Sequence, residues 1–244
     1  MCEAIRVEEE SNIFFYQGTE KLFSKNKLNN DGEKLSFLKQ KITDLLNIKN
    51  IHFLFGSGVS SGSIPTMAGF IEKVEKKLEL ENKIIKDIFN KLKKNDANLE
   101  SILGILYSKR AYQEGIGEED KDIKRLIDLI ENTMFEGINI NIFVDKHKKT
   151  IDLYETFYQK ITYRNKDLSR VNIFTTNNDL FNERVLDKLN INYNNGFGGG
   201  LDKYFNPARF GYTFSKRIEA SVEKYEPLDN MIYLYKLHGS INWI

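Results

Sequence analysis

Three short apolar segments of the chain each end abruptly in small or polar residues. They occupy residues 51–55, 171–174 and 231–237, and they end in Gly56-Ser57-Gly58, Thr175-Thr176-Asn177-Asn178-Asp179 and His238-Gly239-Ser240. Apolar runs of this length between turn residues predict buried strands. A helical pattern follows the first two tips. Strand, polar tip and helix is the order found in open α/β sheets, which bind ligands beyond the carboxyl ends of their strands.

The segment between the first two tips repeats its apolar residues at helical spacing. The spacing predicts helices over residues 66–80, 82–93, 98–113, 118–132 and 145–163, and one more over residues 33–46. Residues 137–144 alternate apolar and polar, which fits either a short strand or an extended lead-in to a helix. Residues 190–230 have no clear period, and they are predicted to form either a lid or partner surface or irregular packing.

Together these elements predict an α/β fold, a Rossmann-like parallel sheet. A helical insertion is expected between the first strand-loop-helix and the second motif strand. Residues 51–70 and 171–244 would form the core, residues 71–170 the mostly helical insertion, and residues 1–50 an N-terminal extension and helix.

Composition narrows the class of protein. The 244 residues include 36 Lys and Arg against 35 Asp and Glu, so the net charge of +1 gives no support to direct nucleic-acid binding. The single cysteine, Cys2, excludes internal disulfides and cysteine-based zinc sites, and no metal site is predicted within this chain. No apolar run approaches the roughly 20 residues of a membrane helix. With no signal peptide in the acidic first residues, we expect a soluble cytoplasmic protein.

Each tip has both a chemical and a purely structural interpretation. Glycines at the first tip let the backbone approach a phosphate, but residues 56–62 match neither G-x-G-x-x-G nor a P-loop, so a simple turn is equally open. A side chain of the second tip could cap the helix that follows it. A lone histidine after the third strand is often structural. We interpret His52 as a core residue and His147 as an exposed residue at a helix start.

Taken together and in order, the three tips resemble the signatures of the sirtuin NAD-binding fold. In that family the signatures read roughly Gly-Ala-Gly-x-Ser…Ile-Pro, Thr-Gln-Asn-x-Asp and His-Gly. This chain has Gly56-Ser57-Gly58-Val59-Ser60 with Ile64-Pro65, then Thr175-Thr176-Asn177-Asn178-Asp179, then Leu237-His238-Gly239-Ser240. The resemblance spans about residues 51–244. In the family a zinc module follows the His-Gly motif, so the single cysteine does not bear on it.

The resemblance implies a role for each matched residue, with NAD as the substrate. The first tip would cradle the pyrophosphate, Asn177 would orient the ribose and the attacking water, and Asp179 would hold the carboxamide. His238 would be the general base, a task that suits histidine because its unperturbed pKa is about 6.5. The implied catalytic residues are therefore Asn177, His238 and Asp179, and the implied NAD-binding residues are Gly56, Ser57, Gly58, Ser60, Pro65, Thr176, Gly239 and Ser240.

Three departures from the family pattern indicate which branch of the sirtuin family the chain resembles. The Phe-Arg that follows Ile-Pro in sirtuin deacylases is replaced by Thr66-Met67, Thr176 stands in place of Gln, and 61 positions separate Asn177 from His238. The stretches Asn-Tyr-Asn-Asn-Gly-Phe (192–197) and Leu-Tyr-Lys-Leu-His-Gly-Ser-Ile-Asn-Trp (234–243) are similar to sirtuin-like domains of bacterial antiphage defence systems.

That branch implies an NAD hydrolase that releases nicotinamide and ADP-ribose and depletes NAD during infection. It also implies homo-oligomers and, in some systems, a HerA-type ATPase/translocase partner. The alternatives are a sensor of NAD or ADP-ribose, a structural subunit of a defence complex without turnover, an NAD-dependent deacylase, or a nuclease partnered to a DNA motor.

Overall fold

The computed structural model describes residues 15–94, 98–162, 164, 168–219 and 223–243. The prediction about Cys2 lies outside these residues. The chain divides into two compact units. One comprises the N-terminal residues up to Ile51 together with residues 164–169, and the other comprises the rest. Among the described residues, no helix is long and apolar enough to cross a membrane.

The first unit contains the predicted N-terminal helix. The strands β1 (Tyr16–Gln17) and β2 (Glu20–Lys21) pair antiparallel, and α1 (Leu22–Lys25) and α2 (Asp31–Leu46) follow. Helix α2 begins two residues before the predicted start because Asn30 caps it, accepting a 2.8 Å hydrogen bond from the Glu33 amide. The helix predicted over residues 33–46 is confirmed.

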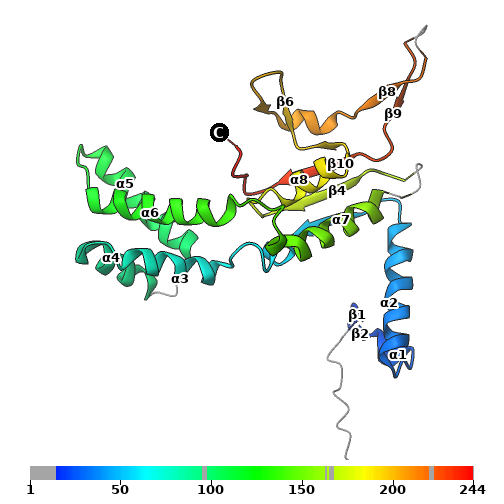
Figure 1. Cartoon of the computed structure of the whole chain (residues 1–244), viewed down its shortest axis with the longest axis horizontal. Coiled ribbons are helices and arrows are strands. Elements are labelled where there is room, and N and C mark those ends of the chain that lie inside the picture. The colour runs from blue at the N-terminus through cyan, green and yellow to red at the C-terminus, as the bar shows by residue number, and fades with distance from the viewer. Residues whose placement is uncertain (1–14, 95–97, 163, 165–167, 220–222, 244) are drawn as a thin grey trace, which may run out of the picture. The chain divides into compact units, whose positions relative to one another are not determined.

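The second unit is a mixed α/β arrangement with a parallel sheet, as predicted (Figure 1). The described strands of this parallel sheet are β3 (His52–Phe55), β4 (Val171–Thr175), β5 (Tyr193–Asn194) and β10 (Ile232–Lys236). They lie in the order β3-β4-β10-β5. Phe55, Thr175 and Lys236 share one register position. The three polar tips therefore leave the sheet at the same edge.

One face of the sheet packs against α7 (Lys148–Thr162) and α8 (Phe181–Lys188). Phe53 and Phe55 of β3 meet Phe157 of α7 edge to face at 4.9 and 5.2 Å between ring centroids. Tyr154 of α7 stacks on Phe181 of α8 at 5.4 Å. The buried side chains of β4 and β10 that continue this face are Val171, Ile173, Thr175, Ile232, Leu234 and Lys236.

On the opposite face of the sheet, two predictions about the first strand are wrong: that the strand is buried and that His52 is a core residue. Strand β3 lies at the edge of the described sheet, and Leu54 is 71% exposed, so β3 is not a fully buried strand. His52 is also exposed and is not a core residue; its ring lies 2.9 Å from the Asn172 amide. The short run of apolar residues could not distinguish an edge strand from a central one, because strand order depends on distant segments.

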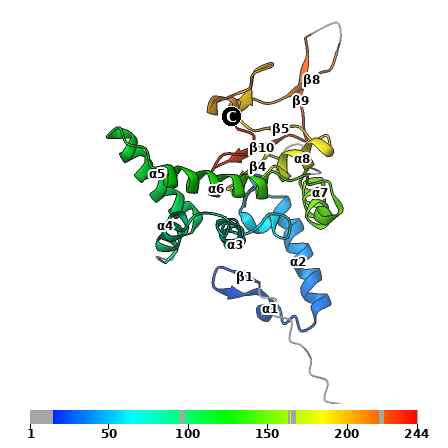
Figure 2. The same cartoon turned by 60° about the vertical axis from the view of Figure 1, so that its left-hand side comes forward.

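Four capped helices between β3 and β4 pack on one another as a bundle (Figures 1 and 2). They are α3 (Met67–Leu78), α4 (Lys83–Lys93), α5 (Leu99–Gly115) and α6 (Lys121–Ile138). The side chains of Thr66, Asn82, Asn98 and Asp120 accept hydrogen bonds from backbone amides at their starts. Fully buried residues at the centre include Val74, Phe89, Leu99, Ile102, Leu126, Ile127 and Ile130.

The structure differs from the sequence prediction around residues 137–147. Helix α6 continues to Ile138, where a strand or extended segment was expected, and a 3-10 turn, η2 (Asp145–His147), precedes α7. Within this added turn Gly137 lets α6 approach α3 closely, because a Cβ there would lie 2.3 Å from the Phe70 ring. His147 is buried, with 5% of its surface exposed, and burial lowers its pKa.

The segment over residues 190–230 contains short ordered pieces. Besides β5 it forms the pair β6 (Phe197–Gly198) and β7 (Tyr204–Phe205), the 3-10 helix η3 (Pro207–Gly211), and the pair β8 (Ser215–Arg217) and β9 (Tyr225–Pro227). These pairs lie beyond the β5 edge of the sheet (Figure 2).

Candidate functional site

Hydrogen bonds tie the three tips to one another. The Thr176 amide donates to the Phe55 carbonyl at 3.1 Å, which joins the second tip to the first. The Leu237 amide donates to the Thr175 carbonyl at 2.8 Å, and the Ile241 amide to the Asn178 carbonyl at 3.1 Å. The first tip is more than 100 positions from the second in the sequence, and the second is more than 50 positions from the third. The three tips nevertheless form one continuous edge of the sheet.

A cavity of about 260 Å³ lies at this edge, between the tips and the helical bundle. The predicted residues Ser57, Ser60, Pro65, Thr176, Asn177, Asp179 and His238 all line it. Helices α3, α5 and α6 contribute the remaining wall, which includes Met67, Phe70, Glu100, Met134 and Ile138. Seven predicted site residues therefore meet where open α/β sheets bind their ligands. We call this cavity the tip pocket.

Ser60 and Asp179 form a buried hydrogen-bond network in the wall of the tip pocket. The Ser60 hydroxyl donates to Asp179 Oδ2 at 2.8 Å and lies 3.0 Å from the Tyr154 hydroxyl. Asp179 Oδ1 accepts the Phe181 amide at 3.0 Å, at the first residue of α8. Burial raises the pKa of the Tyr154 hydroxyl, so it stays protonated and can donate to Ser60. Asp179 thus supports the start of α8, the structural role that the sequence left open.

Asn177 is held by the first tip. Its Nδ2 donates to the Gly56 carbonyl at 3.0 Å and lies 3.4 Å from Ser60 Oγ, and its own amide donates to Thr175 Oγ1 at 3.0 Å. Within the described residues, Asn177 Oδ1 accepts no hydrogen bond. The side chain is therefore fixed in orientation while its carbonyl oxygen remains free to accept one from a ligand.

His238 is the most accessible of the three implied catalytic residues. Its side chain is exposed at the rim of the tip pocket and makes no hydrogen bond within the described part of the chain. The residue after it, Gly239, has a φ of +87°, a conformation that favours glycine. Gly239 therefore sets the sharp turn that leaves His238 at the end of its strand.

Four predicted ligand-binding residues do not line the tip pocket: Gly56, Gly58, Gly239 and Ser240. Gly56 contributes its carbonyl to Asn177. Neither Gly56 nor Gly58 has a heavy atom of the described residues within 4 Å of the position of an added Cβ. The first tip continues as a 3-10 helix, η1 (Ser57–Ser60), and not directly into a long helix. Space beside these glycines remains open next to the pocket.

A buried ion pair that was not predicted from the sequence lies behind the site. Lys236 Nζ lies 3.0 Å from Glu183 Oε1, with 1% and 8% of the two side chains exposed. Lys236 Nζ also donates to the backbone carbonyl of Asp179. Burial raises the pKa of the Glu183 carboxyl, and the charge of Lys236 opposes that rise. The strand register offered a signal, because Lys236 follows the inward-facing Ile232 and Leu234 at a period of two.

Comparison with known proteins adds no assignment. No protein-family model matches the sequence, and no characterised protein matches it significantly.

Proposed function

We propose that the chain is an NAD hydrolase that cleaves NAD to nicotinamide and ADP-ribose. The observation that supports this best is the meeting of Ser57, Thr176, Asn177, Asp179 and His238 around one cavity. These residues come from the three tips that carry the resemblance to sirtuin-like domains, and the resemblance was found in the sequence alone. Depletion of NAD in antiphage defence is the biological role that the same resemblance implies, as are homo-oligomers and a HerA-type partner.

The chemistry suits the residues that are present. The nicotinamide leaving group is already a cation, so the enzyme needs no acid to protonate it. It must hold the ribose, stabilise an oxocarbenium-like state and direct a nucleophile. The fixed carbonyl oxygen of Asn177 would orient the ribose or a water, and the exposed imidazole of His238 would accept the proton.

The size of the tip pocket indicates which part of NAD it would hold. At about 260 Å³ it is slightly below the ~300–1,000 Å³ of typical small-molecule sites. We assign the nicotinamide ribose to the pocket. The pyrophosphate would then lie toward the open space beside Gly56 and Gly58, where bare backbone permits close approach.

One observation favours the alternative of a sensor without turnover. Both carboxylate oxygens of Asp179 already accept hydrogen bonds within the chain, from Ser60 and from the Phe181 amide. A carboxylate so engaged is less free to hold the carboxamide of a substrate. In that case Asp179 would be a structural residue, and the site would bind NAD or ADP-ribose with little chemistry.

The test is incubation with NAD, with nicotinamide and ADP-ribose measured by chromatography. His238→Ala should abolish turnover, and His52→Ala is its matched control, because His52 is also an exposed histidine of the same sheet but lies outside the tip pocket. Equal turnover by the two variants would overturn the role of His238. NAD binding without turnover by the wild type would favour the sensor. Nicotinamide release that requires an acylated peptide would favour the deacylase.

A further inference from the structure

A second and larger cavity lies on the other side of β10 from the tip pocket. Its volume is about 640 Å³, within the range of small-molecule sites. Its lining comes from α8, β5, the β6–β7 pair, η3 and the segment after β10, and none of the predicted site residues contributes to it. We call it the β5 pocket.

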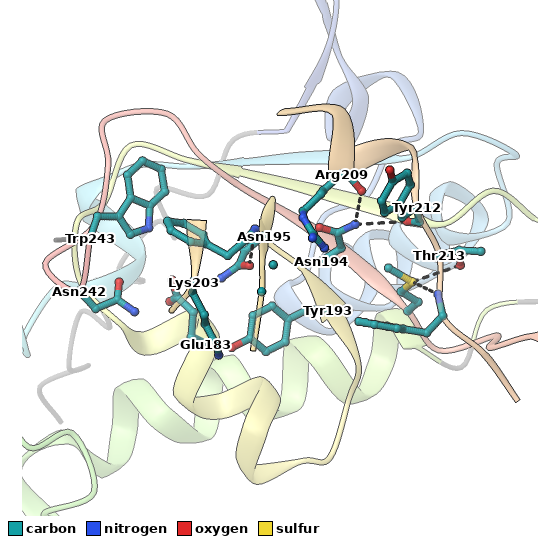
Figure 3. A pocket seen from close by; sticks show the side chains of 15 residues that line it. Glu183, Tyr193, Asn194, Asn195, Lys203, Arg209, Tyr212, Thr213, Asn242 and Trp243 are labelled. Carbon is teal, nitrogen blue, oxygen red and sulfur yellow. Dashed lines mark hydrogen bonds between the residues drawn. The ribbon is translucent and has the colours of Figure 1, made fainter. Parts of the chain in front are cut away.

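Aromatic rings line one end of the β5 pocket. Trp243 packs against Phe197 of β6, with 5.2 Å between ring centroids, and against Phe205 of β7 at the same distance. Figure 3 shows Trp243 and Asn242 at this end and Arg209 and Tyr212 at the other, with Glu183, Tyr193 and Lys203 between them. An aromatic wall of this kind offers a stacking surface to a planar ring.

Two cations of the pocket have no anionic partner in the described part of the chain. Neither Arg209 nor Lys203 makes an ion pair or a side-chain hydrogen bond within the described residues; the Arg209 guanidinium lies 5.9 Å from the Tyr212 ring. A Cβ on Gly198 would lie 1.7 Å from Arg209 Cζ, so the guanidinium lies against the bare backbone of β6. Its N–H groups are therefore held at the wall, and they have no acceptor among the residues that the structure describes.

The floor of the pocket carries a buried acceptor. Glu183 is 6% exposed; its Oε1 pairs with Lys236, while its Oε2 has no hydrogen-bond partner within the described residues. A buried carboxylate oxygen without a donor is costly, so a small shift of the side chain that brought Glu183 Oε2 to the pocket surface would let a ligand N–H group satisfy it. Asn194, by contrast, is fully engaged, since its Nδ2 donates to the Arg209 and Tyr212 carbonyls.

We propose that the β5 pocket binds a nucleotide. The aromatic base would stack against Trp243 and Phe197, with its amino group directed toward Glu183, and its phosphates would bind Arg209 and Lys203. Arginine suits phosphate because its planar fork can donate two parallel hydrogen bonds. An anion alone would leave the aromatic wall unused, and an apolar ligand would leave Arg209 and Lys203 without an anionic partner and Glu183 Oε2 without a donor.

This site goes beyond the proposed NAD hydrolysis and does not depend on it. The two pockets are nevertheless connected, because Lys236 joins Glu183 at the floor of the β5 pocket to the Asp179 carbonyl beside the tip pocket. A ligand that changes the bonding of Glu183 would therefore change the support of Asp179, and the coupling would act equally in both directions.

The chain carries its own probe for the test. Trp243 is the single tryptophan of the sequence, and it lines the β5 pocket. Titration with ADP should change its fluorescence in a saturable way, and calorimetry should give the same affinity. Arg209→Gln should weaken ADP binding about tenfold or more, the loss expected for a charge-assisted contact to phosphate. Arg110→Gln is the matched control, because Arg110 also lies beside a tyrosine ring, Tyr107 at 5.2 Å, but far along the chain on α5.

Two further arms separate this site from the tip pocket and from simple anion binding. Asn177→Ala should leave ADP binding intact; if that variant abolishes the signal while Arg209→Gln keeps it, ADP occupies the tip pocket and the proposal is wrong. Pyrophosphate and adenosine should each bind more weakly than ADP. Pyrophosphate binding as tight as that of ADP, equal binding by the two arginine variants, or no binding at millimolar ADP would each overturn it. An absence of NAD turnover would leave this result unaffected.

Discussion

Replacement of Lys236 by Met tests the structural basis of both pockets. The change removes one partner of a buried ion pair and leaves the Glu183 carboxylate without a counter-charge. Breaking such a pair from one side typically costs about 3–5 kcal/mol of the free energy of unfolding. The Asp179 carbonyl also loses the Lys236 donor.

The magnitude follows from the proton that Glu183 must then take up. A carboxyl with the ordinary pKa of 4.5 is ionised in the unfolded chain at pH 7.5. If Glu183 is protonated in the folded variant, proton uptake lowers the free energy of unfolding by about 1.4 kcal/mol for each pH unit between 4.5 and 7.5. The three units together amount to about 4 kcal/mol. At pH 5.5 only one unit remains, so the cost falls to about 1.4 kcal/mol. This direction is the one expected for a carboxyl whose pKa is raised in the folded state. The variant keeps its stability below the pKa of Glu183 in the unfolded chain and loses it as the pH rises above that value.

Urea unfolding at pH 5.5, 6.5 and 7.5, followed by far-UV circular dichroism, measures this difference between wild type and Lys236→Met. The control is the double variant Lys236→Met/Glu183→Gln, which has no carboxyl to titrate and should lose the same amount at each pH. If Lys236→Met unfolds at pH 7.5, the double variant still shows whether removal of the charge restores the fold. A loss below about 1 kcal/mol at pH 7.5, or one that does not shrink at pH 5.5, would refute the reasoning.

Three further changes test other parts of the fold. Ser60→Ala should cost about 1–3 kcal/mol because it leaves Asp179 Oδ2 buried without its donor, and thermal unfolding with Ser61→Ala as control would measure it. His147→Gln should flatten the loss of wild-type stability as pH falls from 7 to 5, since burial lowers the His147 pKa and protonation opposes folding; unchanged pH dependence would contradict this. Gly137→Ala should displace the Phe70 ring and lower NAD turnover, whereas Gly104→Ala, which meets no atom within 4 Å, should not.

The sequence could reveal the tips because their signals are local. An apolar run, a cluster of turn residues and a following helical period need no knowledge of distant segments. The helix starts at Thr66, Asn82 and Asn98 were accessible for the same reason, since a capping residue lies next to the helix that it caps. Parallel strands then bring their carboxyl ends together, which is why residues 57, 177 and 238 meet.

What the sequence could not reveal depends on pairings between distant elements. The exposure of Leu54 depends on the edge position of β3, and the close approach of α6 to α3 depends on the contact of Gly137 with Phe70. Apart from α8, the β5 pocket is built from pieces of only a few residues, too short to show a period. No local pattern joins Arg209 to Gly198 or Trp243 to Phe197.

Lys236 connects these two kinds of information. The inward orientation of Lys236 could be predicted from the sequence, because alternation along β10 points residues 232, 234 and 236 to the same face. A lysine at an inward position is stable only when a partner balances its charge. That partner, Glu183, lies 53 positions earlier on α8, one helical turn after Asp179. A charged residue at an inward position of a short strand is therefore a reason to search the preceding helix for its counter-charge. Here the search leads from the tip pocket directly to the floor of the β5 pocket, so the ion pair that stabilises one site also forms part of the other.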